Sequence, residues 1–160
     1  MNEPSFVPED FVVPALLETP DFRFRMLSVD DVEKDYEAVM ETQARFHTMG
    51  FTWPREGFTL EENLADLERH QREFLNREAF AYTIVTLDES RVLGCIYINP
   101  SETSHTDARV KLWVRQSEYD KGLDPIVFAA IKQWMTSSWP FTLVSYPGRE
   151  EPDETPPSRD

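Results

Sequence analysis

The sequence has little of several features that usually define a protein class. It contains one cysteine, Cys95, so no disulfide bond can form within the chain. Lys and Arg number 16 against 30 Asp and Glu, and the formal net charge of −14 argues against binding to nucleic acid or anionic membranes. No apolar run approaches the roughly 20 residues that a membrane-spanning helix needs, and no signal-peptide pattern opens the chain. We therefore expect a cytoplasmic protein that binds neither nucleic acid nor membrane.

Metal-binding and nucleophilic patterns are also scarce. The histidines His47, His70 and His105 have neither metal-ligand spacing nor a shared motif, and His70 falls on the polar side of a predicted helix. We expect all three at the surface. Cys95 lies in an apolar run without a basic neighbour, which favours a core thiol over a nucleophile. The sequence thus predicts no metal site.

The chain does have enough apolar residues for one core, because 40% of its 160 residues are hydrophobic. Residues 1–21 interleave four prolines with apolar side chains, so this arm should lie extended against the domain or a neighbouring subunit. Residues 147–160 are rich in proline and acid, and we expect this acidic tail to be disordered. The folded domain is placed at residues 22–146.

Hydrophobic spacing predicts the elements of this domain. Residues 59–62 form a capping box, in which the Thr59 hydroxyl and the Glu62 carboxylate satisfy free amides at the start of a helix. Along 107–115, apolar and mostly charged residues alternate, which predicts a strand with a core face and a polar face. The expected order is strand 22–27, helix 28–43, helix 59–77, strands 80–87 and 91–98 as a hairpin, strand 107–115, apolar helix 125–138 and strand 141–146.

This order, the strand Val92–Ile98 with its Leu93-Gly94 pair, and the strand-loop-glycine-helix passage 110–133 resemble the GNAT family of acyl-CoA-dependent N-acetyltransferases. The resemblance covers residues 22–146. It implies an α+β (mixed α/β) fold with a central, mostly antiparallel sheet flanked by helices, and acetyl-CoA in a splay between the last two strands. The resemblance gives no counterpart for the helix and two strands that close the family fold, so we expect a fold shortened at its C-terminus.

The resemblance also implies a place for each part of acetyl-CoA. Backbone groups around Trp113, Val114 and Arg115 would hold the pantetheine arm. Lys121 and Gly122 would meet the phosphates, which the amides and dipole of the following helix would cradle.

Asp124 complicates this cofactor site. The family motif Arg/Gln-x-x-Gly-x-Gly/Ala reads Tyr119, Gly122 and Asp124 here, so one of its three positions matches. A carboxylate about 5 Å from a phosphate charge, at an effective dielectric near 20, costs roughly 3 kcal/mol, or about a hundredfold in affinity. Asp124 before Pro125 is also a good helix N-cap pair, and we favour that structural role over a working phosphate loop.

Catalytic candidates follow from the resemblance as well. A tyrosine acid on a helix after the fifth strand and an acidic base near the fourth strand are common in the family; here Tyr146 would stand in for the acid, and Asp107, on the polar face of the fourth strand, would be the base. Each also has a structural interpretation, Tyr146 as a packing aromatic and Asp107 as a solvated strand end. Arg109 and Lys111 share the polar strand face with Asp107, and their charge suits anion contact better than base catalysis.

Two functions remain open on this basis. The first is an acyl-CoA-dependent N-acetyltransferase whose acceptor is a small amine, which the acidic surface favours. The second is a catalytically inactive GNAT-fold module that has lost acetyl-CoA affinity and serves in binding or self-association. The unpaired edge of the last strand should be covered either by the arm 1–21 or by a second copy in a homodimer.

Overall fold

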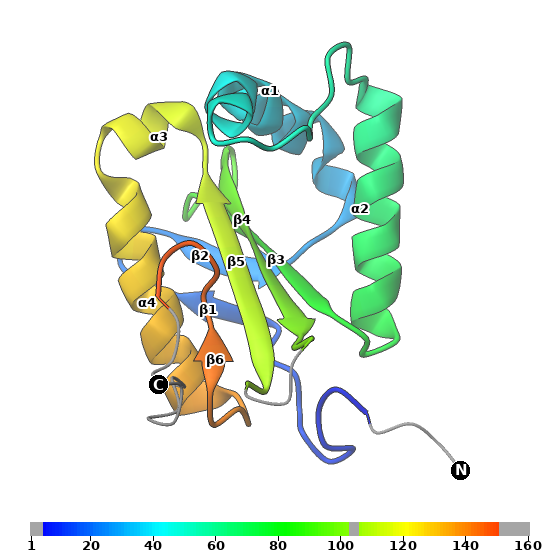
Figure 1. Cartoon of the computed structure of the whole chain (residues 1–160), viewed down its shortest axis with the longest axis vertical. Coiled ribbons are helices and arrows are strands. Elements are labelled where there is room, and N and C mark those ends of the chain that lie inside the picture. Colours follow the sequence, from blue (N-terminus) through cyan, green and yellow to red (C-terminus); the bar gives the residue numbers. More distant parts are fainter. Residues whose placement is uncertain (1–4, 103–105, 151–160) are drawn as a thin grey trace, which may run out of the picture.

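The structure, a computed structural model, describes residues 5–102 and 106–150 (Figure 1). Its centre is a six-stranded sheet in the order β1-β2-β3-β4-β5-β6. Neighbouring strands are antiparallel except β5 and β6, which run parallel. The predicted α+β fold with a mostly antiparallel sheet is confirmed. No helix of these residues is both long enough and apolar enough to span a bilayer.

The helices and strands follow one another in the predicted order, with two short additional elements, β1 and α3. The capping box is present, since the Thr59 hydroxyl accepts from the Glu62 amide at 3.1 Å and Glu62 Oε1 accepts from the Thr59 amide at 2.9 Å. The strands are β1 (Leu16–Glu18), β2 (Arg23–Met26), β3 (Phe80–Val85), β4 (Val92–Pro100), β5 (Ala108–Val114) and β6 (Val144–Ser145); the helices are α1 (Val32–Thr48), α2 (Leu60–Leu75), α3 (Gln116–Asp120) and α4 (Leu123–Ser138).

Two apolar clusters hold the helices against the two faces of the sheet. On one face α4 packs through Val127 and Ile131 onto β2 to β5, as its apolar circumference predicts. On the other face α1 packs through Phe46, whose ring meets the Trp113 ring edge-on at 5.5 Å. The face of β5 that was predicted to be polar therefore ends in a buried tryptophan.

The N-terminal arm packs along the sheet. Its strand β1 pairs with β2, Val7 is 1% exposed, and Phe6 stacks between Phe80 and Phe141 at 5.7 and 5.2 Å. We expected the arm or a second copy to cover the last strand. Instead the strand of the arm, β1, pairs with β2 and covers the opposite edge of the sheet.

The C-terminal segment differs from the prediction. Residues 147–150, expected to be disordered, belong to a turn in which the Tyr146 amide donates to Glu150 O at 2.9 Å and the Glu150 amide donates to Tyr146 O at 3.0 Å. The rest of the predicted tail, residues 151–160, lies outside the described residues, as do residues 1–4 and His105.

Candidate functional site

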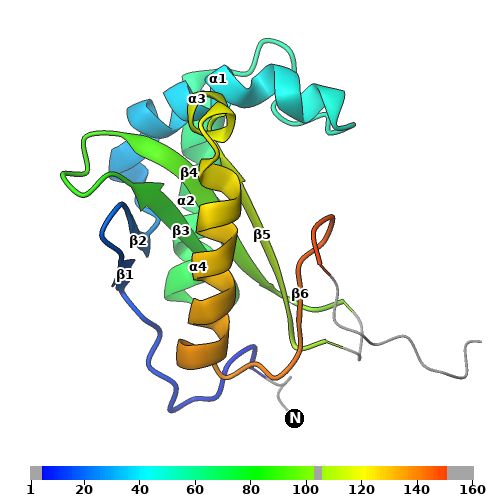
Figure 2. The same cartoon turned by 90° about the vertical axis from the view of Figure 1, so that its left-hand side faces the viewer.

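β5 and β6 are paired over a short length only. Ala108 pairs with Val144 and Arg109 with Ser145, after which β6 ends while β5 continues to Val114. Figure 2 shows the two strands diverging toward the C-terminal end of β5. Divergence leaves backbone groups on the outer edge of β5 without a strand partner. This splay, bounded by β5, β6 and the N-terminal half of α4, is the candidate site.

Two arginines occupy the open edge of β5. Arg149, in the turn after β6, donates to Leu112 O at 3.4 Å. Arg45, near the end of α1, donates to Val114 O at 2.7 Å, and its guanidinium lies 4.0 Å from the centre of the Tyr119 ring. Burial lowers the pKa of Arg45 from its usual value. The carbonyls that a ligand would meet along this edge are thus already hydrogen-bonded to side chains.

The N-terminus of α4 borders the same space. Gly122 is the N-cap of the helix, with a φ of 90° that favours glycine. Asp124 lies in the first turn, so its predicted role as the cap is wrong: the glycine takes the cap position and the helix begins before Asp124. Pro125 remains compatible with this start, because amides of the first turn have no partner within the helix.

Asp124 is paired within the chain. Its carboxylate accepts from both terminal nitrogens of Arg149, at 2.6 and 2.8 Å, and the residue is 8% exposed. Two parallel charge-assisted bonds of this kind are stronger than neutral ones and fix the planes of both groups. The negative charge that was expected to face the phosphates therefore has its counter-ion in place.

Arg115 lies on the other side of β5. It is 3% exposed and donates to Glu41 Oε1 at 2.6 Å and to Val92 O at 3.0 Å, while its amide donates to Leu93 O at 2.7 Å. These bonds tie the end of β5 to α1, and the bond from Arg115 lowers the pKa of Glu41 to about 2. Both the side chain and the amide of Arg115 are thereby directed away from the splay.

The other residues that were predicted to bind the cofactor lie in different places: on the α1 face of the sheet, at the surface and beside the splay. The indole of Trp113 donates to Tyr97 Oη at 3.0 Å on the α1 face of the sheet. Lys121 is largely exposed, with Nζ 3.8 Å from a carboxylate oxygen of Glu118. Only Val114 and Gly122 border the splay directly, through a backbone carbonyl and the start of α4.

Asp107 holds the loop that precedes β6. Its carboxylate accepts from the amides of Thr142 and Leu143 at 2.7 and 3.1 Å and so shapes the loop before β6. It stands at the N-terminal end of β5, roughly 20 Å along the strand from Val114 at 3.3 Å per residue. A role for Asp107 as a base remains a prediction.

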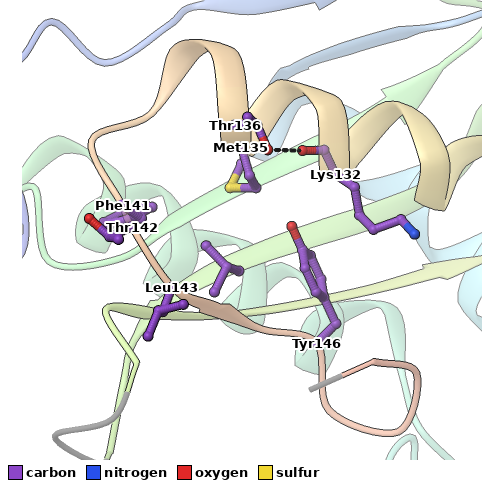
Figure 3. A pocket seen from close by; sticks show the side chains of 8 residues that line it. Lys132, Met135, Thr136, Phe141, Thr142, Leu143 and Tyr146 are labelled. Carbon is purple, nitrogen blue, oxygen red and sulfur yellow. Dashed lines mark hydrogen bonds between the residues drawn. The ribbon is translucent and has the colours of Figure 1, made fainter. Parts of the chain in front are cut away.

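Tyr146 lies next to a pocket of about 250 Å³ between α4 and the segment before β6. Its ring meets Phe128 edge-on at 5.2 Å, and its hydroxyl points toward α4 (Figure 3). Burial raises the pKa of Tyr146 to about 12, so its hydroxyl is protonated at neutral pH. Its role as a general acid remains a prediction.

His70 differs from the surface position that we expected. Its ring packs on Tyr97 with 5.1 Å between ring centres, and burial lowers the pKa of His70 to about 4. The imidazole is therefore neutral at physiological pH. Within residues 5–102 and 106–150, no three His, Cys, Asp or Glu side chains gather as a metal site.

Sequence reasoning missed two residues of this site. Arg45 lies beyond the predicted end of its helix, and Arg149 lies in a segment assigned to the disordered tail. The one available signal for Arg149 was an isolated basic residue among acidic ones in GREEPDE. The composition of such a segment favours disorder, and it does not indicate which residue pairs with the Arg149 guanidinium.

No protein-family model matches the chain, and no curated protein matches its sequence. Solved structures do match its fold. They include the ribosomal-protein-S5-alanine acetyltransferase from Vibrio fischeri (17% identity, TM-score 0.61, 76% of this chain and 67% of that one). The microcin C7 self-immunity acetyltransferase, solved with acetyl-CoA and AMP, matches at 17% identity and a TM-score of 0.60, over 74% of this chain and 62% of that one.

A third similar structure is the acetyltransferase from Salmonella typhimurium described as modifying the N-terminal serine of ribosomal protein L7/L12 (14% identity, TM-score 0.58, 76% of this chain and 67% of that one). The chain spans 65% and 62% of two of the matched structures, less than two thirds of their length. The fold is that of the GNAT acetyltransferases.

Proposed function

We propose that this GNAT-fold chain is an acyl-CoA-dependent N-acetyltransferase that takes acetyl-CoA in the splay between β5 and β6. The observation that carries the proposal is the parallel pairing of these strands, which separates after Arg109 and Ser145 beside the N-terminus of α4. A strand edge that has no strand partner, next to a helix N-terminus, suits a ligand that has both amide groups and phosphates. The acetyl-CoA in one similar structure supports the same ligand class.

Acetyl-CoA does not fit the splay as it stands. The carbonyls of Leu112 and Val114 are engaged by Arg149 and Arg45, and Asp124 lies where the phosphates would approach α4. A ligand amide could pair with β5 only after at least one of these bonds is released. The proposed activity therefore requires a rearrangement of this chain's own side chains before any chemistry.

For the acceptor we propose a small molecule that carries an amine. The formal charge of −14 favours a cationic acceptor over an anionic one. Two of the similar acetyltransferases are described as acting on ribosomal proteins, so peptides with free N-terminal amines belong in the same screen. A cytoplasmic location, where acetyl-CoA is made and used, is part of this proposal.

Calorimetric titration with acetyl-CoA at moderate salt tests the proposal. We expect a saturable heat with a dissociation constant in the micromolar range, and acetylated amine detected by mass spectrometry when acceptors are added. ADP serves as the control ligand, since it carries a diphosphate but no pantetheine arm. Absence of binding up to millimolar acetyl-CoA would favour the inactive GNAT-fold module instead.

A further inference from the structure

We propose that Arg149 is an intramolecular latch that closes the splay, and that acyl-CoA enters only when Arg149 releases Asp124 and Leu112. The inference rests on the proposed function, because it concerns the same cleft. Its basis is that one side chain, from the turn after β6, bonds to both of the other elements that bound the cleft.

The geometry places the guanidinium across the opening. Arg149 reaches the first turn of α4 through the bidentate bond to Asp124, at 2.6 and 2.8 Å, and reaches β5 through Leu112 O at 3.4 Å. The turn that carries it follows β6, the third wall of the splay. A ligand amide that pairs with β5 and a phosphate that approaches α4 would each compete with Arg149 for its bonding partner.

The turn is held to α4 at a second point further along the helix. Glu150 accepts from Lys132 Nζ at 2.9 Å, and both Lys132 and Arg149 lie over the Phe128 ring, at 4.6 and 5.3 Å. The Lys132–Glu150 pair is more exposed, with side chains 38% and 55% accessible against 25% and 12% for Arg149 and Asp124. Exposed pairs contribute little, so the Arg149–Asp124 pair is the one that holds the turn.

The latch also accounts for an acidic residue at a position where the family motif has glycine or alanine. Asp124 would repel phosphates if it stood alone in the first turn of α4. Paired with Arg149, it instead anchors the segment that covers the cleft. Removing the carboxylate of Asp124 should therefore strengthen acyl-CoA binding in two ways, because it opens the latch and removes a negative charge.

Two effects must be separated in the test. Arg149→Gln alone leaves Asp124 unpaired beside the phosphates, so the double variant Asp124→Asn/Arg149→Gln is the decisive protein. Arg69→Gln serves as the control for the arginine substitution, since it makes the same charge change as Arg149→Gln at a side chain that is 47% exposed and 3.9 Å from its acidic partner.

Acetyl-CoA affinity is measured by calorimetry for the wild-type chain, Asp124→Asn, the double variant and Arg69→Gln. We expect both variants at the latch to bind at least about tenfold more tightly than the wild type, and the control to bind as the wild type does. A double variant that binds no more tightly than the wild type would overturn the latch.

Hydrogen–deuterium exchange of the peptide that contains Tyr146 to Glu150 provides a readout without ligand. The double variant should exchange the amides of this turn faster than the wild type, while the amides of β3 stay protected. Equal exchange would count against the latch. Faster exchange with no acetyl-CoA binding by any protein would instead overturn the proposed function, so the two failures are distinguishable.

Discussion

Asp35 is the side chain whose burial has the clearest energetic consequence. It lies on α1 with 4% of its surface exposed and accepts from Asn63 Nδ2 at 2.9 Å. Burial raises its pKa from 3.8 to about 6, and the nearby carboxylates of Asp31 and Asp66 act in the same direction. The folded protein thus binds this proton more tightly than the unfolded chain does.

The pH dependence of stability follows from that shift. Between pH 4 and 6 the folded state holds the Asp35 proton and the unfolded state loses it, so stability falls as pH rises through this window and stays lowered above it. A shift of this size corresponds to about 3 kcal/mol. Asp35→Asn should flatten this slope and raise the melting temperature at pH 7.5.

Thermal unfolding at pH 4.5, 6 and 7.5 measures the effect, with Asp10→Asn as the control because Asp10 is exposed. The control should follow the wild type within about 0.5 kcal/mol, as surface substitutions usually do. An Asp35→Asn protein with the wild-type pH slope would show that Asp35 stays charged in the folded state.

Sequence patterns located some residues of the site and not others. Gly122 and Asp124 could be placed at the start of α4 because strand, glycine and apolar helix follow one another locally. The pairing of Asp124 with Arg149 could not be predicted, since it depends on how the chain turns after β6. The partners of the Arg115 side chain could not be predicted for a related reason: Glu41 and Val92 are far away in sequence, and only the folded sheet brings them together.

Among the elements, the β4–β5 pair depends most on a single small residue. Gly94 stands opposite Val114, and a Cβ atom at Gly94 would lie 2.0 Å from Trp113 O and 2.9 Å from the Val114 Cα. Both are backbone atoms, so an added methyl group would force the strands apart. The displaced part of β5 is the part that carries the open edge of the splay.

Gly94→Ala should therefore lower the free energy of unfolding by at least about 2 kcal/mol, measured by urea denaturation. Gly50→Ala is the comparison, because Gly50 has a φ of 98° but no atom within 4 Å of the added Cβ. Its cost is backbone strain alone, about 1 kcal/mol. A Gly94→Ala protein as stable as Gly50→Ala would mean that the two strands adjust more freely than their packing indicates.

Element prediction succeeded where patterns were long. The stripes that mark α1 and α2 extend over several turns, and their helices are present, although α1 continues to Thr48, beyond its predicted end. The short elements α3 and β1 were not predicted. With five and three residues, they are too short to show the hydrophobic spacing of a helix or a strand. For the last strand, 141–146 was predicted but only Val144 and Ser145 pair, since Asp107 holds the preceding amides in a loop.

At the scale of the whole molecule, the arm completes the core that α4 covers. Phe6, Phe11 and Val13 pack against the main cluster, and the Tyr82 hydroxyl donates to Pro14 O at 2.6 Å. An arm that buries aromatic rings contributes to global stability and not only to local order. Assembly as a homodimer stays a prediction, which sedimentation velocity can measure.

Phe6→Ala should lower the free energy of unfolding by about 2 kcal/mol, because it removes a ring stacked on both Phe80 and Phe141. Val12→Ala in the same arm is the control, since Val12 is 83% exposed and should change stability by less than about 0.5 kcal/mol. Chemical denaturation of both variants gives the comparison. Equal stability of the two would show that the arm detaches from the sheet in solution.

The burial of Cys95 has a practical consequence for studies of this protein. Its thiol is 1% exposed within β4, and burial raises the pKa of Cys95 well above the usual range. Since the thiolate is the reactive form, an aromatic disulfide reagent should modify the protein only when the sheet opens. The rate at which the reagent releases its coloured thiolate then reports the opening of the sheet under native conditions. The same measurement applies to every variant that keeps Cys95, and none of them needs an added label.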